Sequence, residues 1–337
     1  TGLRFFLRDL TEGLSWQLLG DGPDAPATIV WRPGRQTRTL EGLGLRVVIE
    51  TCVLADAPAE LRRVTITNLG DRLRKLDLTS LTEVVLNSLP GHESHPGFSK
   101  LFLQTSFDRS RRALHVSRRP RDPQDHFPTV VHALIEDGPL EHETDRARFL
   151  GRGRPDDRPL AQLPGRPLSG TVGNVLDPVV SLRRAMSLGP QRQATLTFLL
   201  GAFDEDATPL LHALAADGGV EAAFAAAETA AADQLRSLGL NAEEYDAAQQ
   251  LFVGMSLENR ALRAPAARLE KMGADRASLE DLGIRTGGPL AVVQGDSPEC
   301  VALKKYAMAW KKMNQASQLV VLGGSDSGNN DKSSILG

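Results

Sequence analysis

The chain has 337 residues, of which 41% are hydrophobic and 24% are charged. These proportions are ordinary for a folded globular protein, and the length is enough for two domains. The formal net charge of −3 gives no general reason to expect nucleic acid or an anionic membrane as a partner.

The cysteines and the apolar runs bear on the compartment of the protein and on whether it spans a membrane. Cys52 and Cys300 lie far apart and have no metal-ligand spacing, which suits a reducing compartment. No window approaches the ~20 continuous apolar residues that span a bilayer. The first residues, TGLRFFLRDL, contain no secretory signal and are interpreted as a start inside a longer reading frame.

Residues 1–204 carry the pattern of an antiparallel β protein. Short segments rich in β-branched and aromatic residues alternate with Gly, Pro and Asp clusters, which is typical of a large sandwich. The predicted strands are ATIVW (27–31), LRVVIETCVL (45–54), RRVTITNL (62–69), RKLDLTSLTEVVLN (74–87), SKLFLQTSF (99–107), ALHVSRR (113–119), TVVHALIE (129–136) and ATLTFLLGAF (194–203). The NLGDRLR segment (68–74) predicts a hairpin connection, because Asn and Gly-Asp favour turn conformations.

The pattern becomes helical near residue 205. An alanine-rich stretch over 204–240 repeats apolar residues at three and four positions, and Asp206 or Thr208 is a candidate cap before Pro209. A second helical pattern covers 242–264, and a third covers 299–315. Two short apolar runs, PLAVVQ (289–294) and LVVL (319–322), resemble strands. The tail GGSDSGNNDKSSILG has the composition of a disordered terminus.

Most polar clusters favour a structural interpretation. His92 and His95 have a loop spacing that a metal site could use, but no cysteine or third histidine lies near them in sequence. A polar turn before the LFLQT strand is therefore the preferred interpretation. The glycines of LGRGRP (150–155) precede no predicted helix, so a dinucleotide-type phosphate loop is not expected.

Two arginine-rich stretches leave alternatives open. SRRPRD (117–122) is either an exposed loop or a fork of guanidiniums for sugar hydroxyls, carboxylates or phosphate. In HETDRARFLGRGR (142–154), Glu143, Asp145, Arg146 and Arg148 are able to pair locally, with Phe149 and Leu150 as an anchor in the core. Gly151 and Gly153 would then turn the backbone so that Arg152 and Arg154 project. Local ion pairing and the aiming of arginines at a neighbour are both consistent with this pattern.

Taken in order, these motifs resemble a known family. The series FFLRDLTEGLSW, VTITNLGDRLRKLDLTSLTEVVLN, HPGFSKLFLQTS, RRPR, HETDRARFLGRGR, LSGTVGNVLDPV and LNAEEYDAAQQLF is similar to glycoside hydrolase family 94 (formerly glycosyltransferase family 36). That family contains inverting β-glucoside phosphorylases and the C-terminal region of cyclic β-1,2-glucan synthases. The synthase and 1,2-β-oligoglucan phosphorylase branch is the nearest in motif order. The resemblance covers residues 1 to about 265 and continues more weakly to 322.

The resemblance implies a fold in three parts. We expect a β-supersandwich over residues 1–204 and a helical linker over 205–265, followed by the incomplete start of an (α/α)6 barrel over 266–322 and a disordered tail over 323–337. The LGIRTGGPL segment (282–290) departs from the family pattern at Arg285, Thr286 and Gly287, which puts the first part of the barrel in doubt.

The resemblance also implies a reaction. Inverting glycosidases use a carboxylic acid and a base on opposite faces of the sugar. In this family inorganic phosphate is the nucleophile and co-substrate, so one catalytic acid suffices, and the barrel is expected to carry it. No catalytic residue, metal or other cofactor is therefore assigned to this chain, and Asp281 and Asp296 are not given that role.

Binding roles implied by the resemblance fall on the two arginine stretches. Arg148, Arg152 and Arg154 are the candidate contacts to a β-glucan oligosaccharide, in the same or the neighbouring subunit of a homodimer, and Arg119 and Arg121 are a second candidate pair. Neither nucleic acid nor direct membrane contact is expected. The location implied is the cytoplasm, or the cytoplasmic side of an inner-membrane synthase.

Three functional hypotheses follow. The first is the non-catalytic N-terminal part of an enzyme that makes or phosphorolyses β-glucans, inactive by itself, with β-1,2 linkages suggested by the branch. The second is a stand-alone sandwich that binds carbohydrate or mediates dimerisation without catalysis. The third is a truncated product whose helices after residue 205 expose apolar faces and aggregate.

Overall fold

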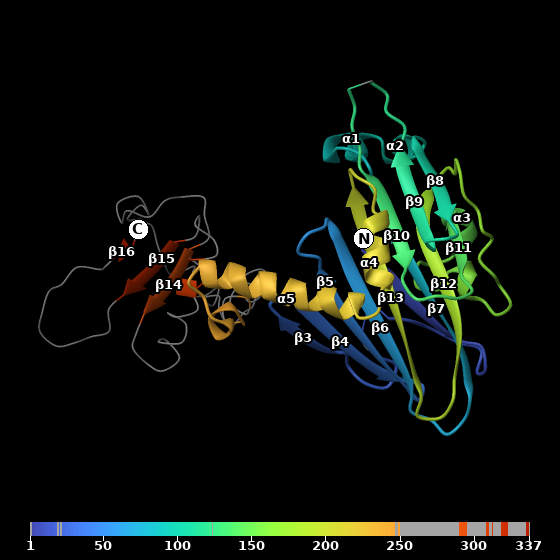
Figure 1. Ribbon diagram of the computed structural model, residues 1–337, viewed down its shortest axis with the longest axis horizontal. Helices are drawn as coiled ribbons and strands as arrows, with labels where there is room; N and C mark the ends of the chain where they lie inside the picture. Colours follow the sequence, from blue (N-terminus) through green and yellow to red (C-terminus); the bar gives the residue numbers. More distant parts are fainter. Residues whose placement is uncertain are drawn as a thin grey trace, which may run out of the picture. The chain divides into compact units, whose positions relative to one another are not determined.

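The computed structural model describes residues 2–246 except 19, 21 and 123, together with residues 249, 290–294, 308–309, 312, 318–322 and 335–336. The chain divides into two compact units, Thr1–Thr229 and Ala230–Gly337. Two antiparallel sheets make up most of the first unit (Figure 1).

The two sheets differ in size. The five-stranded sheet contains, in spatial order, β11 (Glu141–Asp145), β12 (Pro178–Leu188), β7 (Arg74–Glu83), β1 (Arg4–Asp9) and β2 (Leu14–Gln17). The eight-stranded sheet contains β3 (Thr28–Arg32), β4 (Arg35–Gly42), β5 (Leu45–Val53), β6 (Ala59–Asn68), β13 (Gln193–Phe203), β10 (Thr129–Leu134), β9 (Ala113–Arg118) and β8 (Leu103–Asp108). The predicted antiparallel sandwich is confirmed.

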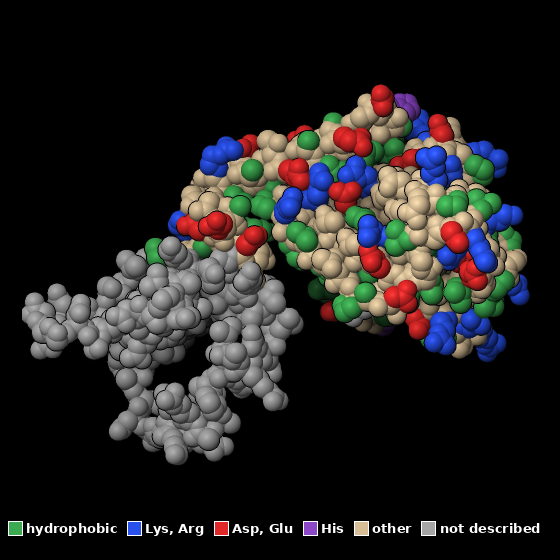
Figure 2. Space-filling model, turned by 90° about the horizontal axis from the view of Figure 1, so that it is seen from below, with side chains coloured by type: hydrophobic (Ala, Val, Ile, Leu, Met, Phe, Trp, Pro, Cys, Tyr) green, Lys and Arg blue, Asp and Glu red, His purple; other side chains and the backbone are tan. Residues whose placement is uncertain are grey.

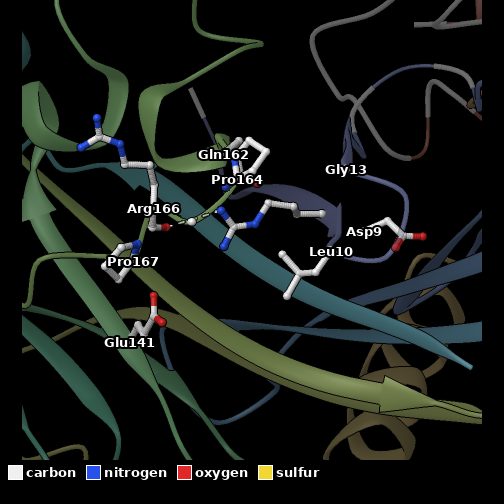
Figure 3. Close-up of a pocket in the computed structure, with 10 residues that line it drawn as sticks. Asp9, Leu10, Gly13, Glu141, Gln162, Pro164, Arg166 and Pro167 are labelled. Carbon is white, nitrogen blue, oxygen red and sulfur yellow. Dashed lines mark hydrogen bonds between the residues drawn. The ribbon is translucent and has the colours of Figure 1, made fainter.

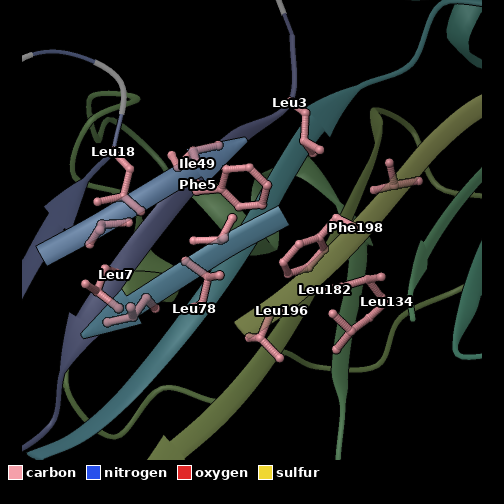
Figure 4. Packing of buried hydrophobic residues seen from close by; sticks show 14 of the residues in the cluster. Leu3, Phe5, Leu7, Leu18, Ile49, Leu78, Leu134, Leu182, Leu196 and Phe198 are labelled. Atoms are coloured by element: carbon pink, nitrogen blue, oxygen red, sulfur yellow. The ribbon is translucent and has the colours of Figure 1, made fainter. Parts of the chain in front are cut away.

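The main core lies between the sheets because side chains alternate along each strand. On β7, Leu76 and Leu78 belong to this core, whereas Asp77 and Leu81 do not. Figure 4 shows side chains from both sheets meeting, and the rings of Phe5 and Phe198 lie 5.0 Å apart between centroids. Each fully buried Leu or Phe contributes roughly 1.5–3 kcal/mol relative to an exposed one, so this layer dominates the stability of the sandwich.

Two helices cover the outer face of the eight-stranded sheet. In α4 (Thr208–Ala215) and the first part of α5 (Gly219–Ser237), Leu211, Leu214 and Phe224 pack against Leu61 and Leu199. The helices predicted over 204–240 are confirmed in this part. Pro209 lies in the first turn of α4 as predicted, but neither candidate caps the helix. The N-cap position is Ala207, and the Asp206 carboxylate accepts hydrogen bonds from the backbone N–H (3.0 Å) and hydroxyl (2.7 Å) of Thr208.

The outer face of the five-stranded sheet is covered by the segment 146–168. Phe6, Leu81 and Val179 from the strands form a second apolar cluster with side chains from α3 (Arg146–Leu150) and the turns that follow it. Phe149, Leu150, Ala161 and Leu168 are the covering residues. The sandwich therefore has a further layer on each side.

The hairpin predicted at residues 68–74 is wrong. β6 belongs to the eight-stranded sheet and β7 to the five-stranded sheet, so this connection crosses from one sheet to the other. Asn68 fixes the crossing: its side-chain amide donates to the carbonyl oxygens of Leu188 and Gly189, 3.0 Å away in each case. The local turn chemistry is as expected, because Asn68 Oδ1 accepts from the N–H of Gly70.

The polar turn predicted around His92 and His95 is also replaced by regular structure. Two short helices, α1 (Leu89–Ser94) and α2 (Pro96–Lys100), precede β8, which begins at Leu103 rather than residue 99. The Ser88 hydroxyl accepts a hydrogen bond from Gly91 N–H, and a proline stands in the first turn of each helix. Proline at that position loses no helical hydrogen bond, so these breakers begin helices here.

Beyond residue 246 only short pieces are described. The strand-like runs are confirmed as β14 (Leu290–Gln294) and β15 (Gln318–Leu322), which pair in parallel, and β16 (Ile335–Leu336) pairs with β15. Most of the second helical pattern, the helix predicted over 299–315, the expected barrel start over 266–322, the departure at Arg285–Gly287 and the expected disordered tail lie outside the described residues.

None of the helices described has, by itself, the length and apolar content to cross a bilayer. α4 and α5 together pass by length and composition, but they are bent by 108° at the break between them.

One buried histidine joins the two sheets. His132 on β10 is fully buried, with Nε2 2.7 Å from the Ser80 hydroxyl on β7 and Nδ1 2.9 Å from the carbonyl oxygen of Leu199. A carbonyl can only accept, so Nδ1 carries the proton and Nε2 accepts from Ser80. Burial lowers the pKa of His132 to about 4, so the imidazole is neutral in the folded protein.

This histidine should make stability depend on pH. The unfolded chain binds a proton at His132 below about pH 6.5, whereas the folded chain does not until about pH 4, so acidification favours unfolding between these values. We expect His132 to lower the free energy of unfolding by about 2 kcal/mol between pH 7 and pH 5. Urea titrations of the parent and of His132→Gln, followed by fluorescence, measure this contribution; equal pH dependence in both proteins would contradict it.

Candidate functional site

β11 begins the arginine-rich stretch 142–154 and is held in place by a buried carboxylate. Glu143 on β11 is 2% exposed, and its Oε1 accepts from the backbone N–H groups of Thr144 and Asp145, at 3.0 Å each. Its Oε2 accepts from the backbone N–H (3.1 Å) and the hydroxyl (2.5 Å) of Ser169. Glu143 therefore binds the loop backbone and not an arginine, contrary to the local pairing that we considered.

The segment after Asp145, which the sequence indicated as a loop, begins with a short helix, α3. The Asp145 carboxylate accepts from the N–H groups of Ala147 (2.8 Å) and Arg148 (3.4 Å), so it caps the helix. Phe149 and Leu150 are buried, and the Phe149 ring lies 6.0 Å from the ring of Phe6. The predicted anchor in the core is confirmed.

Arg146 has a structural role that local reasoning did not find. Its guanidinium lies 3.1 Å from Glu83 at the end of β7, 3.6 Å from Asp156 and 3.8 Å from Asp177. These three carboxylates come from different parts of the chain. Arg146 thus ties the beginning of α3 to the sheet and to the flanking loops, and its charge is compensated within the fold.

The three candidate arginines occur within residues 148–154, here called the arginine loop, which comprises the end of α3 and the turns that follow it. Arg148 is 60% exposed and lies 3.5 Å from Asp145. Arg152 is exposed and makes no hydrogen bond or ion pair with other described residues. Arg154 donates from Nε to the carbonyl oxygen of Arg158 at 2.8 Å. Gly151 and Gly153, with φ of 80° and 70°, turn the backbone between them.

The arginine stretch 117–122 borders a cavity, here called the Arg118 cavity. This cavity has a volume of about 810 Å³ and is lined by α1, α2, the end of β9 and the loop over 121–127. The guanidinium of Arg118 lies 5.1 Å from the ring centres of Phe102 and Phe127. Arg121 lies 5.7 Å from Phe98 and 5.5 Å from Phe102. Such stacking holds a guanidinium flat against a ring.

The structure separates the two arginines predicted at this site. Arg121 lines the Arg118 cavity, whereas Arg119 is exposed and does not line it. Arg118, which we did not select from the sequence, lines the cavity and donates to the carbonyl oxygen of Ser99 at 2.8 Å. Burial, followed by the nearby charge of Arg121, lowers the pKa of Arg118. The cavity offers guanidiniums, an amide and an aromatic ring, Phe98, that is 52% exposed.

Ion pairs connect α2, which lines the Arg118 cavity, to the start of α3. Lys100, at the end of α2, lies 2.5 Å from Asp177, which in turn contacts Arg146 at the start of α3. Exposed apolar side chains occur on the same connected elements: Leu89, Phe98, Leu101, Val172 and Leu176, of which Leu176 is 81% exposed. These five exposed side chains are a candidate contact surface for another protein segment.

The described part of the chain contains no group of three His, Cys, Asp or Glu side chains placed to hold a metal ion. On the face shown in Figure 2, basic and acidic side chains are interspersed and do not form a field of one sign.

The two glycines of the arginine loop provide a matched test of its geometry. A Cβ on Gly151 would lie 2.8 Å from Cβ of Leu160, and its φ of 80° and ψ of 152° are essentially restricted to glycine. Gly153 has open space around it. We expect Gly151→Ala to destabilise the fold by about 3 kcal/mol and Gly153→Ala by about 1 kcal/mol, measured by urea unfolding. Equal losses would show that the contact with Leu160 does not constrain the loop.

Comparisons with known proteins relate the two-sheet sandwich to carbohydrate-active enzymes. Residues 1–220 match the family model described as glycosyl hydrolase 94, supersandwich domain. The chain is 36% identical over 205 residues to the cyclic beta-(1,2)-glucan synthase NdvB of Rhizobium meliloti, covering 59% of this chain and 7% of the synthase. It is 26% identical over 237 residues to the solabiose phosphorylase of Paenibacillus borealis, covering 66% of this chain and 29% of that protein.

Among solved structures, a polysaccharide lyase aligns with a TM-score of 0.36 and 14% identity, over 61% of this chain and 26% of the lyase. The family match spans both sheets and the helix α4. The chain therefore belongs to glycoside hydrolase family 94 and carries the supersandwich domain of that family.

Proposed function

We propose that this chain is the non-catalytic supersandwich part of an enzyme that makes or phosphorolyses β-glucans, with β-1,2 linkages as the first candidates. The family match and the names of the two relatives support this proposal. The chain covers well under two thirds of each relative. We place inverting phosphorolysis, with inorganic phosphate as co-substrate, in a barrel that is not among the described residues.

The observation that carries the proposal is the exposure of arginines on a firmly held loop. Phe149 and Leu150 anchor α3, while Arg148 and Arg152 remain exposed directly beside them. An exposed guanidinium can turn to a pair of sugar hydroxyls at little desolvation cost, and its planar fork suits two acceptors at once. Arg148, Arg152 and Arg154 are therefore proposed as glucan contacts, and Arg121 as a second candidate; Arg119 is the weakest of the five.

The exposed apolar side chains beside the two arginine stretches support a further part of the proposal. We propose that this surface contacts the rest of the enzyme or a second subunit of a homodimer, which would bring the arginine loop to a substrate. The location proposed is the cytoplasm or the cytoplasmic side of an inner-membrane synthase.

Glucan binding tests the role of the arginine loop. We expect the chain to bind β-1,2-glucotetraose saturably in calorimetric titrations, and Arg148→Ala or Arg152→Ala to raise the dissociation constant about tenfold, because each removes a charged hydrogen-bond donor. Arg192→Ala, at an exposed arginine in the β12–β13 turn, is the control and should bind like the parent. Unchanged affinity in both loop variants would rule out this role.

A stand-alone carbohydrate-binding domain is the alternative, favoured by the 810 Å³ Arg118 cavity with its exposed Phe98. Both proposals place the catalytic acid outside this chain. We therefore expect no glucose 1-phosphate when the chain is incubated with phosphate and β-1,2-glucooligosaccharides, as followed by a coupled enzymatic assay. Phosphate-dependent release above a protein-free blank would contradict both, and loss of glucan binding in Arg121→Ala but not in Arg148→Ala would favour the alternative.

A further inference from the structure

A second cavity lies on the outer face of the five-stranded sheet, at the end of β11 opposite to α3, and is lined by none of the five candidate arginines. It has a volume of about 440 Å³ and is here called the Gln162 cavity. Figure 3 shows Glu141, Arg166 and Pro167 on one side and Asp9 and Leu10 on the other. The remaining lining residues are Arg8, Gly13, Gln162, Pro164 and Gly165.

Two buried arginines of the five-stranded sheet, one on β1 and one on β12, hold the wall formed by residues 161–167. Arg8 donates from Nη1 to the carbonyl oxygen of Leu163 at 2.6 Å, and the same nitrogen lies 3.4 Å from the carbonyl oxygen of Arg166. Arg183 donates to the carbonyl oxygens of Ala161 (2.6 Å) and Arg166 (2.8 Å). Backbone held at this many points has little freedom left to lose when a ligand binds.

The opposite wall, the β1–β2 turn, is equally constrained. Asp9 Oδ1 accepts from the N–H groups of Thr11 (2.8 Å) and Glu12 (3.1 Å), while Oδ2 pairs with Arg74. The cavity is thus preformed between two rigid elements, as is typical of small-molecule sites, and its volume falls within their usual range of about 300–1,000 Å³.

The polar group that most needs a partner in this cavity is the amide of Gln162. The residue is 5% exposed, and neither its Oε1 nor its Nε2 has a hydrogen-bond partner among the described residues. An amide has two donors and an acceptor with two lone pairs, and burying it unpaired is costly. A ligand hydroxyl, which both donates and accepts, would satisfy it.

The charges around the cavity favour a neutral ligand. Arg8 pairs with Asp77 at 2.7 Å, and Asp9 pairs with Arg74. Glu141 pairs with Arg183 at 3.3 Å but keeps 45% of its side chain exposed. Among the lining residues described, only the exposed Arg166 has a guanidinium without an ion-pair partner. A carboxylate and a guanidinium on the same side of the cavity suit hydroxyl groups better than a strongly charged ligand.

Apolar surface completes the site. Leu10 is 44% exposed, and Pro164 and Pro167 are exposed on the opposite side. These side chains can pack against the C–H face of a pyranose ring while its hydroxyls reach the polar groups. From this combination we propose that the Gln162 cavity binds one or two sugar units of a neutral saccharide, at a site separate from the arginine loop.

The choice of β-glucan as that saccharide rests on the proposed function, whereas the class of ligand rests on the cavity. Glu141 begins β11 and Asp145, which caps α3, ends it, so the two sites are separated by about the length of this strand, ~13 Å. A glucan chain of a few units can span this distance, and the cavity then acts as an anchor for a chain whose other part reaches the arginine loop.

Two variants test the cavity without disturbing the walls. Gln162→Leu keeps the volume and removes an unpaired amide, and Arg166→Ala removes a side chain that is exposed, since only the backbone carbonyl of Arg166 holds the loop. With β-1,2-glucotetraose as the probe, we expect each variant to raise the dissociation constant about tenfold in calorimetric titrations. Arg192→Ala is again the control: on addition of the tetraose, hydrogen exchange should show added protection over 160–168 in the parent and in this control, and less protection in the two cavity variants.

The pattern across variants separates this inference from the proposed role of the arginine loop. Weaker binding in the cavity variants but not in Arg148→Ala or Arg152→Ala supports the cavity and removes the loop. The reverse pattern overturns the cavity and leaves the loop, and a flat titration of the parent overturns both. Displacement of the saccharide by inorganic phosphate, dependent on Arg166, would overturn the assignment of a neutral ligand.

Discussion

The outer face of the five-stranded sheet depends on one buried group of charges, Arg8, Asp77 and Arg183. Asp77 lies 2.7 Å from Arg8 and 3.7 Å from Arg183, and all three side chains are almost completely buried. Burial raises the pKa of the Asp77 carboxyl, while the hydrogen bond from Arg8 and the charge of Arg183 act in the opposite direction. Charges in such a position persist only as a group, since removing one leaves the others uncompensated. The arginines use their remaining donors on backbone carbonyls of 161–166, so the covering segment is bound to the charges beneath it.

That segment is held differently at its two ends, and this division organises the surface. Near α3 the contact is apolar, through Phe149 and Leu150 on Phe6 and Leu81. Towards residue 166 the contact is polar, through the buried arginines. At the apolar end, Phe149 and Leu150 point into the core and the charged side chains of the arginine loop face outward. At the polar end, the guanidinium N–H groups of Arg8 and Arg183 donate to backbone carbonyls, and the Gln162 amide has no partner among the described residues. Gly151 and Leu160 bring the two ends into close approach, so a change in one is expected to reach the other.

Sequence reasoning predicted the parts of this arrangement that are decided locally. Alternation predicted eight strands of the two sheets but not β1, β2, β4, β11 or β12. The Phe149–Leu150 pair predicted the anchor of the arginine-rich stretch 142–154, and the alanine-rich pattern with Pro209 predicted the start of α4. Where two distant segments must meet, local patterns could not decide. Asn68 and Gly70 form the expected turn contact, yet which sheet the next strand joins depends on pairing with β1 and β12. Arg8 and Arg183 look like solvent-facing positions of amphipathic strands. The segment that buries them lies about 150 residues from Arg8 in the sequence, and no local motif connects the two.

Burial divides the arginines of this domain into two groups with different capacities. Arg8 and Arg183 are surrounded by fixed acceptors, and Arg146 lies among three carboxylates, so redirecting any of them towards a ligand would break contacts that hold the fold. Arg148, Arg152 and Arg166 are exposed, and their present contacts are few and weak in water. Their guanidiniums can therefore bind a sugar for the modest cost of ordering a side chain. An arginine-rich motif read from sequence mixes both groups, and only the burial of each guanidinium shows which of them remain available for recognition.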